Sequence, residues 1–182
     1  SPFPPSLRYA AGVFHKPTGQ LLPAMIAGVS RSDRRLTAVQ ITYLDSRGRK
    51  SNVSTPRWTV GPLGMGAVHL APVDDVIGLA EGTETALAAT QLTGVPTWAV
   101  LGAKRLGRIR LPYGVRRVHL FTDNDEPGEA AGKRASEHYS RLGYHVEVQS
   151  PLEGNDFADA LLALHNKAVA SQSHPRWKLS LK

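Results

Sequence analysis

The chain has 182 residues, of which 41% are hydrophobic, enough for one compact domain or two small ones. It contains no cysteine, which excludes disulfides, thiolate zinc sites and cysteine nucleophiles and fits a cytoplasmic protein. No apolar run of about 18 residues occurs, so no transmembrane helix is predicted. The N-terminal residues lack the pattern of a signal peptide and are compatible with the cut edge of a longer protein.

The net charge of +7 is unevenly distributed along the chain. Residues 1–75 carry nine Lys or Arg and four Asp or Glu, residues 76–165 carry nine and eleven, and residues 166–182 carry four and none. An acidic centre between basic flanks suits an enzyme that acts on phosphodiesters, because carboxylates hold cations while Lys and Arg hold the polyanion. Charge alone is equally compatible with a soluble protein of high isoelectric point.

The first part of the chain predicts a small, mainly β, basic subdomain over residues 1–72. Residues 1–23 are rich in proline and are expected to be irregular, whereas the runs 23–30 and 36–44 flank a polar turn and predict a β-hairpin. A glycine-rich segment at 61–66 lacks the Gly-Lys-Ser/Thr ending of a P-loop, so its glycines are interpreted as turn residues. The subdomain displays four basic residues, for which a solvated loop is the alternative interpretation: Arg47, Arg49, Lys50 and Arg57.

From residue 73 the pattern changes to alternating strands and helices. Strands are expected at 76–80, 95–101, 118–121 and 144–148, with helices at 83–93, 128–142 and from 155 to about 164. This alternation predicts an α/β domain over 73–166, built on a four-stranded, largely parallel sheet with flanking helices. A basic C-terminal tail is expected over 167–182.

Acidic residues follow two of the expected strands. Glu81 comes directly after the run 76–80, and Asp123 and Asp125 come just after 118–121. Residues beyond the carboxyl ends of parallel strands lie in the crevice where ligands bind, so the three carboxylates converge if these strands are neighbours. A divalent cation held by oxygen ligands would relieve their repulsion. The alternative for each aspartate is a helix cap or a turn residue.

Three motifs resemble the Toprim domain of bacterial-type primases, type IA and type II topoisomerases, certain nucleases and recombination proteins. They are Glu81-Gly82-x-x-Thr85-Ala86-Leu87, then Asp123-x-Asp125 with Gly128, then Asp156-Phe157-x-Asp159. Trp98-Ala99, Leu111-Pro112 and Gly143-x-x-Val146 are similar to the branch in primases and primase–helicases of phages, plasmids and integrative elements. Basic segments upstream resemble those that precede Toprim in these proteins, so the resemblance covers roughly residues 20–165 and implies a Rossmann-like Toprim fold.

The resemblance implies roles for particular residues. Glu81 matches the glutamate that acts as general acid/base or places a metal, and Asp123 and Asp125 match the metal-binding pair. Asp156 and Asp159 match a later acidic motif that holds a second metal or the nucleotide's metal, although Asp156 is also interpretable as an N-cap and Asp159 as a surface residue. The implied cofactor is Mg²⁺ or Mn²⁺. Five basic residues are expected to hold the template or the triphosphate: Arg47, Arg49, Lys50, Arg57 and Lys104.

The implied activity is that of a DNA primase, a nucleotidyltransferase that makes short RNA primers on single-stranded DNA for a phage, plasmid or mobile element. Its partners would be the template, nucleoside triphosphates, and a zinc-binding module and replicative helicase in cis or trans; no membrane is implied. The chain itself has neither the cysteines of a zinc module nor a Walker motif. The alternatives are a Toprim nuclease or strand-cleaving enzyme and a non-catalytic module that binds nucleic acid. The basic segment before Glu81 favours the primase.

Overall fold

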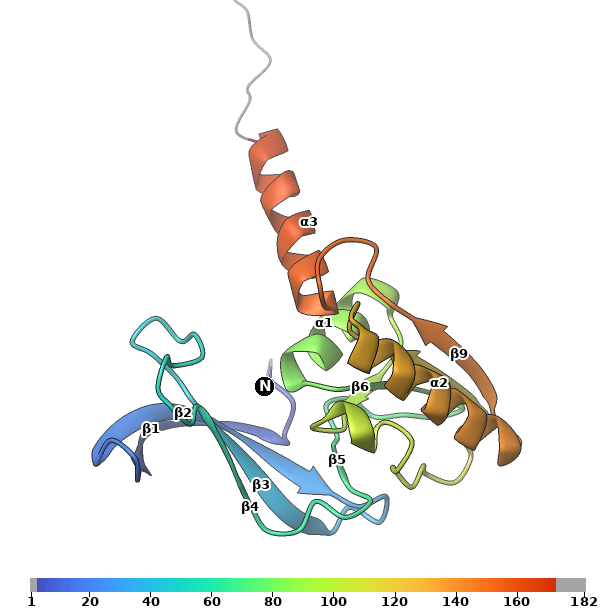
Figure 1. The fold of residues 1–182 in the computed structure, drawn as a ribbon, viewed down its shortest axis with the longest axis horizontal. Coiled ribbons are helices and arrows are strands. Elements are labelled where there is room, and N and C mark those ends of the chain that lie inside the picture. The colour runs from blue at the N-terminus through green and yellow to red at the C-terminus, as the bar shows by residue number, and fades with distance from the viewer. Residues whose placement is uncertain (1–2, 173–182) are drawn as a thin grey trace, which may run out of the picture.

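The structure is a computed structural model that describes residues 3–172 (Figure 1). Within these residues, nine strands form one sheet in the order β4-β3-β2-β5-β7-β6-β8-β9, with β1 beside β2. The strands are β1 (Leu7–His15), β2 (Gln20–Ser30), β3 (Leu36–Tyr43), β4 (Arg57–Val60), β5 (Ala67–Val68), β6 (Val76–Ala80), β7 (Thr97–Ala99), β8 (Arg117–Phe121) and β9 (His145–Gln149). The helices are α1 (Thr83–Thr93), the 3₁₀ turn η1 (Ala103–Arg105), α2 (Glu126–Arg141) and α3 (Phe157–Gln172).

The first four strands form an antiparallel layer, drawn from blue to cyan in Figure 1. The predicted hairpin is confirmed, because β2 pairs with β3 from Ala24 opposite Tyr43 onward. The expectation that residues 1–23 are irregular is wrong, because β1 pairs with β2 along most of its length. Three of the prolines that suggested irregularity precede β1, Pro17 lies in the turn that joins β1 to β2, and Pro23 lies in β2 where the pairing register shifts, so none of them prevents the pairing of β1 with β2.

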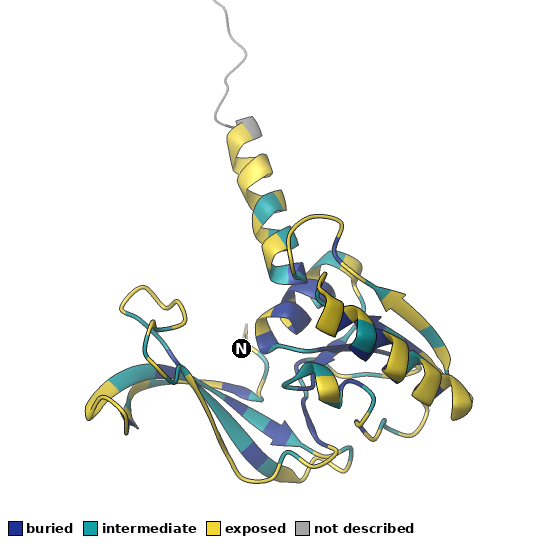
Figure 2. Cartoon of the chain, in the orientation of Figure 1, coloured by how far each residue is buried: buried dark blue, intermediate teal, exposed yellow. Residues whose placement is uncertain are grey.

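The second half has the expected α/β architecture. β6 lies between β7 and β8, β9 follows β8, and all three pairings are parallel. Alternate residues of β6 enter different apolar cores: Ile77 and Leu79 pack with α2, whereas Ala80 packs with α1 and the start of α3. Strands buried on both faces read as continuous apolar runs, which is why the sequence indicated them clearly. Figure 2 shows the buried residues concentrated in β6, β8 and α1.

A two-residue strand joins the halves. β5 pairs with β2 on one side through Val68 opposite Val29, and with β7 on the other through Val68 opposite Ala99. Both β5 residues are buried. The side chain of Arg105 strengthens this connection, because its guanidinium donates to the backbone oxygens of Gly64 and Gly66 at 2.9 and 2.6 Å. The expected β subdomain is therefore continuous with the sheet of the α/β half.

The last helix is longer than expected. α3 continues to Gln172 and extends away from the rest of the molecule (Figure 1). Residues 163–170 contain alanine, leucine and no proline or glycine, so nothing in them ends a helix. Of the expected basic tail, residues 173–182 lie outside the described part of the chain. In that part, no helix is long and apolar enough to cross a membrane.

We expect Gly78→Ala to lower the free energy of unfolding by about 1–3 kcal/mol, as overpacking of a core does. A Cβ at this position would lie 2.7 Å from Phe121 Cε2 and closer still to the Thr97 hydroxyl. Urea unfolding measures the effect. Gly12→Ala in β1 is the matched control, because its Cβ would meet Leu21 Cβ at an ordinary 3.6 Å. Equal destabilisation by both substitutions would contradict the prediction.

Candidate functional site

The parallel pairing of β6 and β8 brings the predicted acidic residues to one edge of the sheet. Ala80 lies opposite Phe121 in this pairing, so Glu81 and Asp123 leave the two strands side by side. The loop after β8 is also joined to the loop before α3, where the N–H of Asn124 donates to the Asn155 oxygen at 2.7 Å. That hydrogen bond brings the later acidic motif to the same edge.

Asp123 is the centre of the site. Burial, together with the negative charges of four neighbours, raises the pKa of its carboxyl to about 6; these neighbours are Glu81, Asp156, Asp125 and Asp159. Its Oδ1 is buried and has no hydrogen-bond partner among the described residues. A buried carboxylate oxygen without a donor is unfavourable unless another group compensates it, and a cation does so directly. The structure thus brings all five predicted carboxylates into electrostatic contact.

Asp125 has a structural role as well. Its Oδ1 accepts a hydrogen bond from the Gly128 N–H at 2.7 Å, which makes it the N-cap of α2. This leaves the second carboxylate oxygen available for other donors or a cation. The glycine is required by space, because a Cβ at position 128 would meet the Asp123 carbonyl oxygen and would lie 3.0 Å from Asp125 Oδ1. Gly128, which belongs to the second Toprim-like motif, therefore lets the chain turn tightly around Asp123 and Asp125.

The aspartates of the later motif hold the start of α3. Asp156 Oδ1 accepts from the Asp159 N–H at 2.8 Å, and Asp159 Oδ2 accepts from the Asn155 N–H at 3.1 Å. The N-cap interpretation of Asp156 is therefore confirmed. Each carboxylate keeps one oxygen outside these hydrogen bonds.

The donor set fits a hard divalent cation, which takes carboxylate oxygens as ligands. The buried, unpartnered Asp123 oxygen and the mutual repulsion of the carboxylates both favour such a cation. In residues 3–172, however, no three Asp, Glu or His side chains are already arranged to hold one ion together. The assignment of Mg²⁺ or Mn²⁺ to Glu81, Asp123, Asp125, Asp156 and Asp159 stays a prediction.

The N-terminus of α1 adjoins this edge. Its N-cap is Gly82, which provides no side-chain hydrogen bond, so the first N–H groups of the helix have no side-chain cap. Exposed N–H groups at a helix N-terminus favour phosphate and other anions. Arg57 on β4 reaches the same helix end, where its guanidinium pairs with Glu84 Oε1 at 3.0 Å. The structure thus places one predicted basic residue beside the acidic edge.

The other predicted basic residues lie elsewhere. Arg47, Arg49 and Lys50 are exposed in the loop between β3 and β4, which projects away from the α/β half in Figure 1. Arg49 pairs there with Asp45 at 2.9 Å, and its backbone N–H holds the pKa of Asp45 below the usual value. Lys104 is exposed in η1. Whether any of these four contacts nucleic acid stays a prediction.

One feature beside Glu81 was not predicted from the sequence. Leu101 has a φ of 61°, a left-handed conformation that is rare for leucine, and its N–H donates to the Glu81 carbonyl oxygen at 2.8 Å. Only the glycine that follows signalled this turn. On β4, 53% of the surface of Trp58 is exposed, so this residue does not belong to a core.

Family models match both halves of the chain. The Toprim domain model matches residues 76–165, and a domain of unknown function (DUF7146) matches residues 1–70. Comparison with curated protein sequences finds no match.

Solved primase structures share the fold. The primase fragment of the bacteriophage T7 primase-helicase protein superposes with a TM-score of 0.58 at 16% identity, covering 84% of this chain and 63% of that one. A DNA primase domain from Pseudomonas aeruginosa gives 0.55 at 19% identity, covering 88% and 56%. The E. coli primase catalytic core gives 0.56 at 15% identity, covering 82% and 51%. The chain thus spans less than two thirds of each of these structures.

Residues 76–165 form a Toprim domain. The family model, the parallel sheet and the position of the acidic motifs all support this assignment. Together with the antiparallel strands before it, this domain has the fold of the catalytic cores of bacterial and phage primases.

The raised pKa of Asp123 predicts how stability depends on pH without metal. The folded state favours the protonated carboxyl of Asp123. The contribution of this group to the free energy of unfolding is therefore fully present below the unfolded-state pKa of 3.8 and is lost as the pH rises through the folded-state pKa of about 6. Asp123→Asn should therefore melt like the wild type below about pH 4 and at a higher temperature near pH 7. Thermal unfolding in a chelator measures this.

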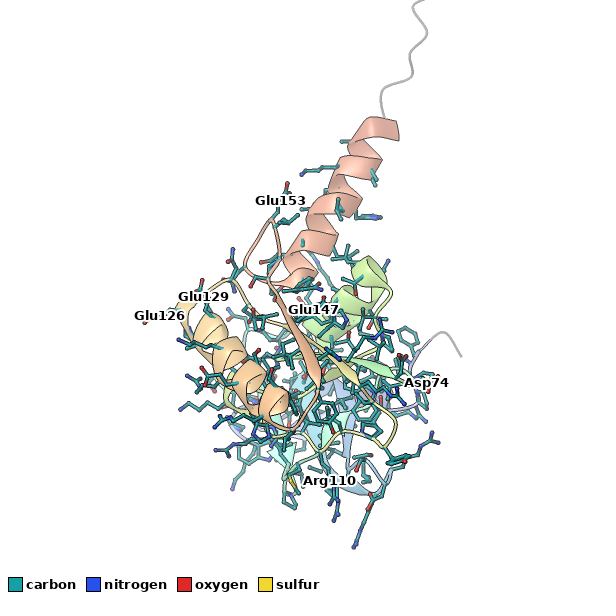
Figure 3. All side chains as sticks on the ribbon, turned by 90° about the vertical axis from the view of Figure 1, so that its right-hand side faces the viewer. Asp74, Arg110, Glu126, Glu129, Glu147 and Glu153 are labelled. Carbon is teal, nitrogen blue, oxygen red and sulfur yellow. The ribbon has the colours of Figure 1, made fainter. Side chains whose placement is uncertain are left out.

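Asp74→Asn provides the control, because Asp74 is exposed and precedes β6, whereas Glu81 follows the same strand. Asp74 is labelled in Figure 3. Its substitution should not reproduce the pH-dependent gain. Equal stabilisation by both variants would indicate a general charge effect and contradict the role of the acidic cluster.

Proposed function

We propose that the protein is a DNA primase core, which transfers ribonucleotides onto a growing primer along a single-stranded DNA template. The observation that carries the proposal is the set of carboxylates around the buried, unpartnered oxygen of Asp123, at the carboxyl edge of a Toprim sheet. The fold supports the choice of reaction, since structures of this fold include a primase catalytic domain bound to single-stranded DNA. Mg²⁺ or Mn²⁺ is the proposed cofactor.

The carboxylates divide the work in this proposal. Asp123 and Asp125, with support from Asp156 and Asp159, would hold the cations, which lower the pKa of an attacking 3′-hydroxyl and neutralise charge on the phosphates. Glu81 lies beside Asp123 and is suited to accept the hydroxyl proton or to orient the acceptor. The uncapped N–H groups of α1 and the guanidinium of Arg57 are positioned to bind phosphate oxygens.

A second candidate, cleavage of DNA, uses the same carboxylates. The extended antiparallel layer favours polymerisation, because a polymerase must grip template and nucleotide beside its metals, and Arg57 connects that layer to α1 at the acidic edge. A third candidate is a domain that binds nucleic acid without catalysing a reaction. It gives no functional reason for the mutually repelling carboxylates around Asp123. Both candidates are outcomes of the assay below.

Other partners follow from the proposal. Template recognition is expected to need a zinc-binding module, as in the Aquifex aeolicus primase structure that contains zinc-binding and RNA polymerase domains. A replicative helicase is the expected partner at a replication fork, and the T7 relative is itself part of a primase-helicase protein. We propose that the protein acts in the cytoplasm on replication of a phage, plasmid or other mobile element.

We expect the protein to convert labelled ribonucleoside triphosphates into short oligonucleotides on single-stranded DNA, with Mg²⁺ or Mn²⁺ present. Asp125→Asn should reduce the rate by at least about 100-fold, because it removes a cation-binding charge. The amide should still cap α2, as asparagine does, so thermal stability should change little. Gel analysis of the products measures the activity.

Asp74→Asn is the matched control, because it makes the same chemical change at an exposed residue before β6, outside both the acidic edge and the cavities. It should keep full activity. If the template DNA is shortened and no new oligonucleotides form, the primase proposal is wrong and the protein is a nuclease. If neither product forms, the assay is repeated with a zinc-binding module fused to the N-terminus. If the fusion is also inactive, only the third candidate remains, a domain that binds nucleic acid without catalysis.

A further inference from the structure

A groove lies at the end of the parallel strands opposite the acidic edge. Residues 108–116 run directly into β8, and Tyr144 directly precedes β9, so both mark the amino ends of strands whose carboxyl ends carry the acids. β8 has five residues, which separates the two edges by about 17 Å. The cavity there has a volume of about 980 Å³. We call it the distal groove; the residues that define it are Arg31, Arg108, Arg110, Tyr113, Arg116 and Tyr144.

The distal groove carries positive charge that is not compensated locally. Asp33 is the only acidic residue among those that line it, and its Oδ2 lies 3.8 Å from Arg31 Nε. Within the described residues, the side chains of Arg108, Arg110 and Arg116 form no ion pair, whereas neighbouring Arg117 pairs with Asp75 at 3.0 Å. Figure 3 shows Arg110 at the opposite end of the molecule from Glu126, Glu129 and Glu153.

A second cavity prolongs the positive surface. It has a volume of about 750 Å³, meets the distal groove at Ser32 and Pro112, and adds Arg8 and Arg34 without any acidic residue. All the cations of the combined path are arginines. The guanidinium fork binds phosphate oxygens in pairs and also stacks on flat rings, which an ammonium group does not do. The path is thus suited to a ligand that carries several phosphates and rings.

The arginines stand on a backbone that is held from several sides. The Tyr139 hydroxyl lies 3.2 and 3.0 Å from the backbone oxygens of Leu106 and Ile109, and both of these residues are buried. The N–H of Arg110 donates to the Met65 oxygen at 3.3 Å. Anchored residues therefore alternate with outward cations. This fixed arrangement lowers the entropy cost of binding a polyanion, unlike a loose charged loop.

Aromatic rings lie among the cations. The Tyr113 side chain is fully exposed in the loop between η1 and β8, and Tyr144 lines the groove from the start of β9. An exposed tyrosine ring beside arginines offers a platform for an unpaired base, and bases stacked on such rings contribute to binding without sequence preference. A duplex keeps its bases stacked inside and cannot use this platform.

We propose that the distal groove binds single-stranded nucleic acid at a second position, remote from the acidic edge. It would hold a stretch of the strand that does not take part in the reaction and so retain the template during synthesis. The proposal rests on the proposed function only in the choice of the partner. Binding at the groove requires neither the acidic residues nor their metal.

The test measures binding of fluorescent single-stranded DNA by anisotropy in a chelator, at several salt concentrations. The double variant Arg108→Gln, Arg110→Gln should weaken binding by about tenfold and reduce the slope of log affinity against log salt by about 1.4, as expected for two lost phosphate contacts. Tyr113→Ala should weaken binding of single strands by about tenfold while leaving the salt slope unchanged.

The matched control is Lys133→Gln, Arg134→Gln, which removes two exposed charges from α2 outside both cavities. It should leave affinity nearly unchanged. If it weakens binding as much as the groove variant, net charge alone explains the effect and the proposal is overturned. Equal affinity of the groove variant and the wild type also overturns it, and tighter binding of duplex than of single strands overturns the choice of ligand.

The Asp123→Asn variant separates this proposal from the proposed function. In the chelator it should bind single-stranded DNA at least as well as the wild type, because it loses negative charge and keeps the groove. If the protein makes no primers but the groove variants still lose binding, the proposed function fails and the distal groove stands. If primers form but the groove variants bind single-stranded DNA normally, the proposed function stands and the proposal for the distal groove fails.

Discussion

The parallel pairing of β6 with β8 is the constraint on which the site depends. This register makes both strands end at the same edge, so Glu81 and Asp123 must lie together whatever their charges. The resulting repulsion and burial raise the pKa of Asp123 to about 6 and leave its Oδ1 without a donor. A chain under no functional constraint would place neutral residues there, because perturbed carboxylates cost stability. A bound cation converts the same arrangement into a favourable one.

Capping and the proposed cation binding involve the same aspartates. Asp125 caps α2 and Asp156 caps the start of α3, each through one oxygen. A carboxylate has a second oxygen, so the cap interpretation and the metal interpretation of these residues are compatible. The caps also orient the carboxylates, since the helices fix their backbones relative to β8. This explains why an amide that preserves the cap is the informative substitution and an alanine is not.

The continuous sheet separates opposite charges in space. β5 joins the antiparallel layer to the Toprim strands, and Arg105 ties the glycine-rich turn before β5 to the loop after β7. Acidic residues thereby collect at the carboxyl edge of the parallel strands, and arginines that form no ion pair within residues 3–172 collect at the amino edge. Under the two proposals, a polyanion that crosses the molecule between these edges would be attracted by the arginines at the amino edge and would reach the proposed metal site at the carboxyl edge.

The local pattern of apolar residues in the sequence was enough to predict the strands that are buried on both faces and the acidic residues that follow them. β6 and α1 have the predicted bounds, and Glu81, Asp123 and Asp125 lie where the runs of apolar residues end, because period and burial are properties of a single segment. Only the tertiary structure decided what depends on distant segments. The role of the two-residue strand β5 comes from its pairing partners on both sides, which lie far from it in the sequence. The anchoring of residues 105–110 by Tyr139 and by the glycine-rich turn likewise joins parts of the chain whose complementarity no local pattern records.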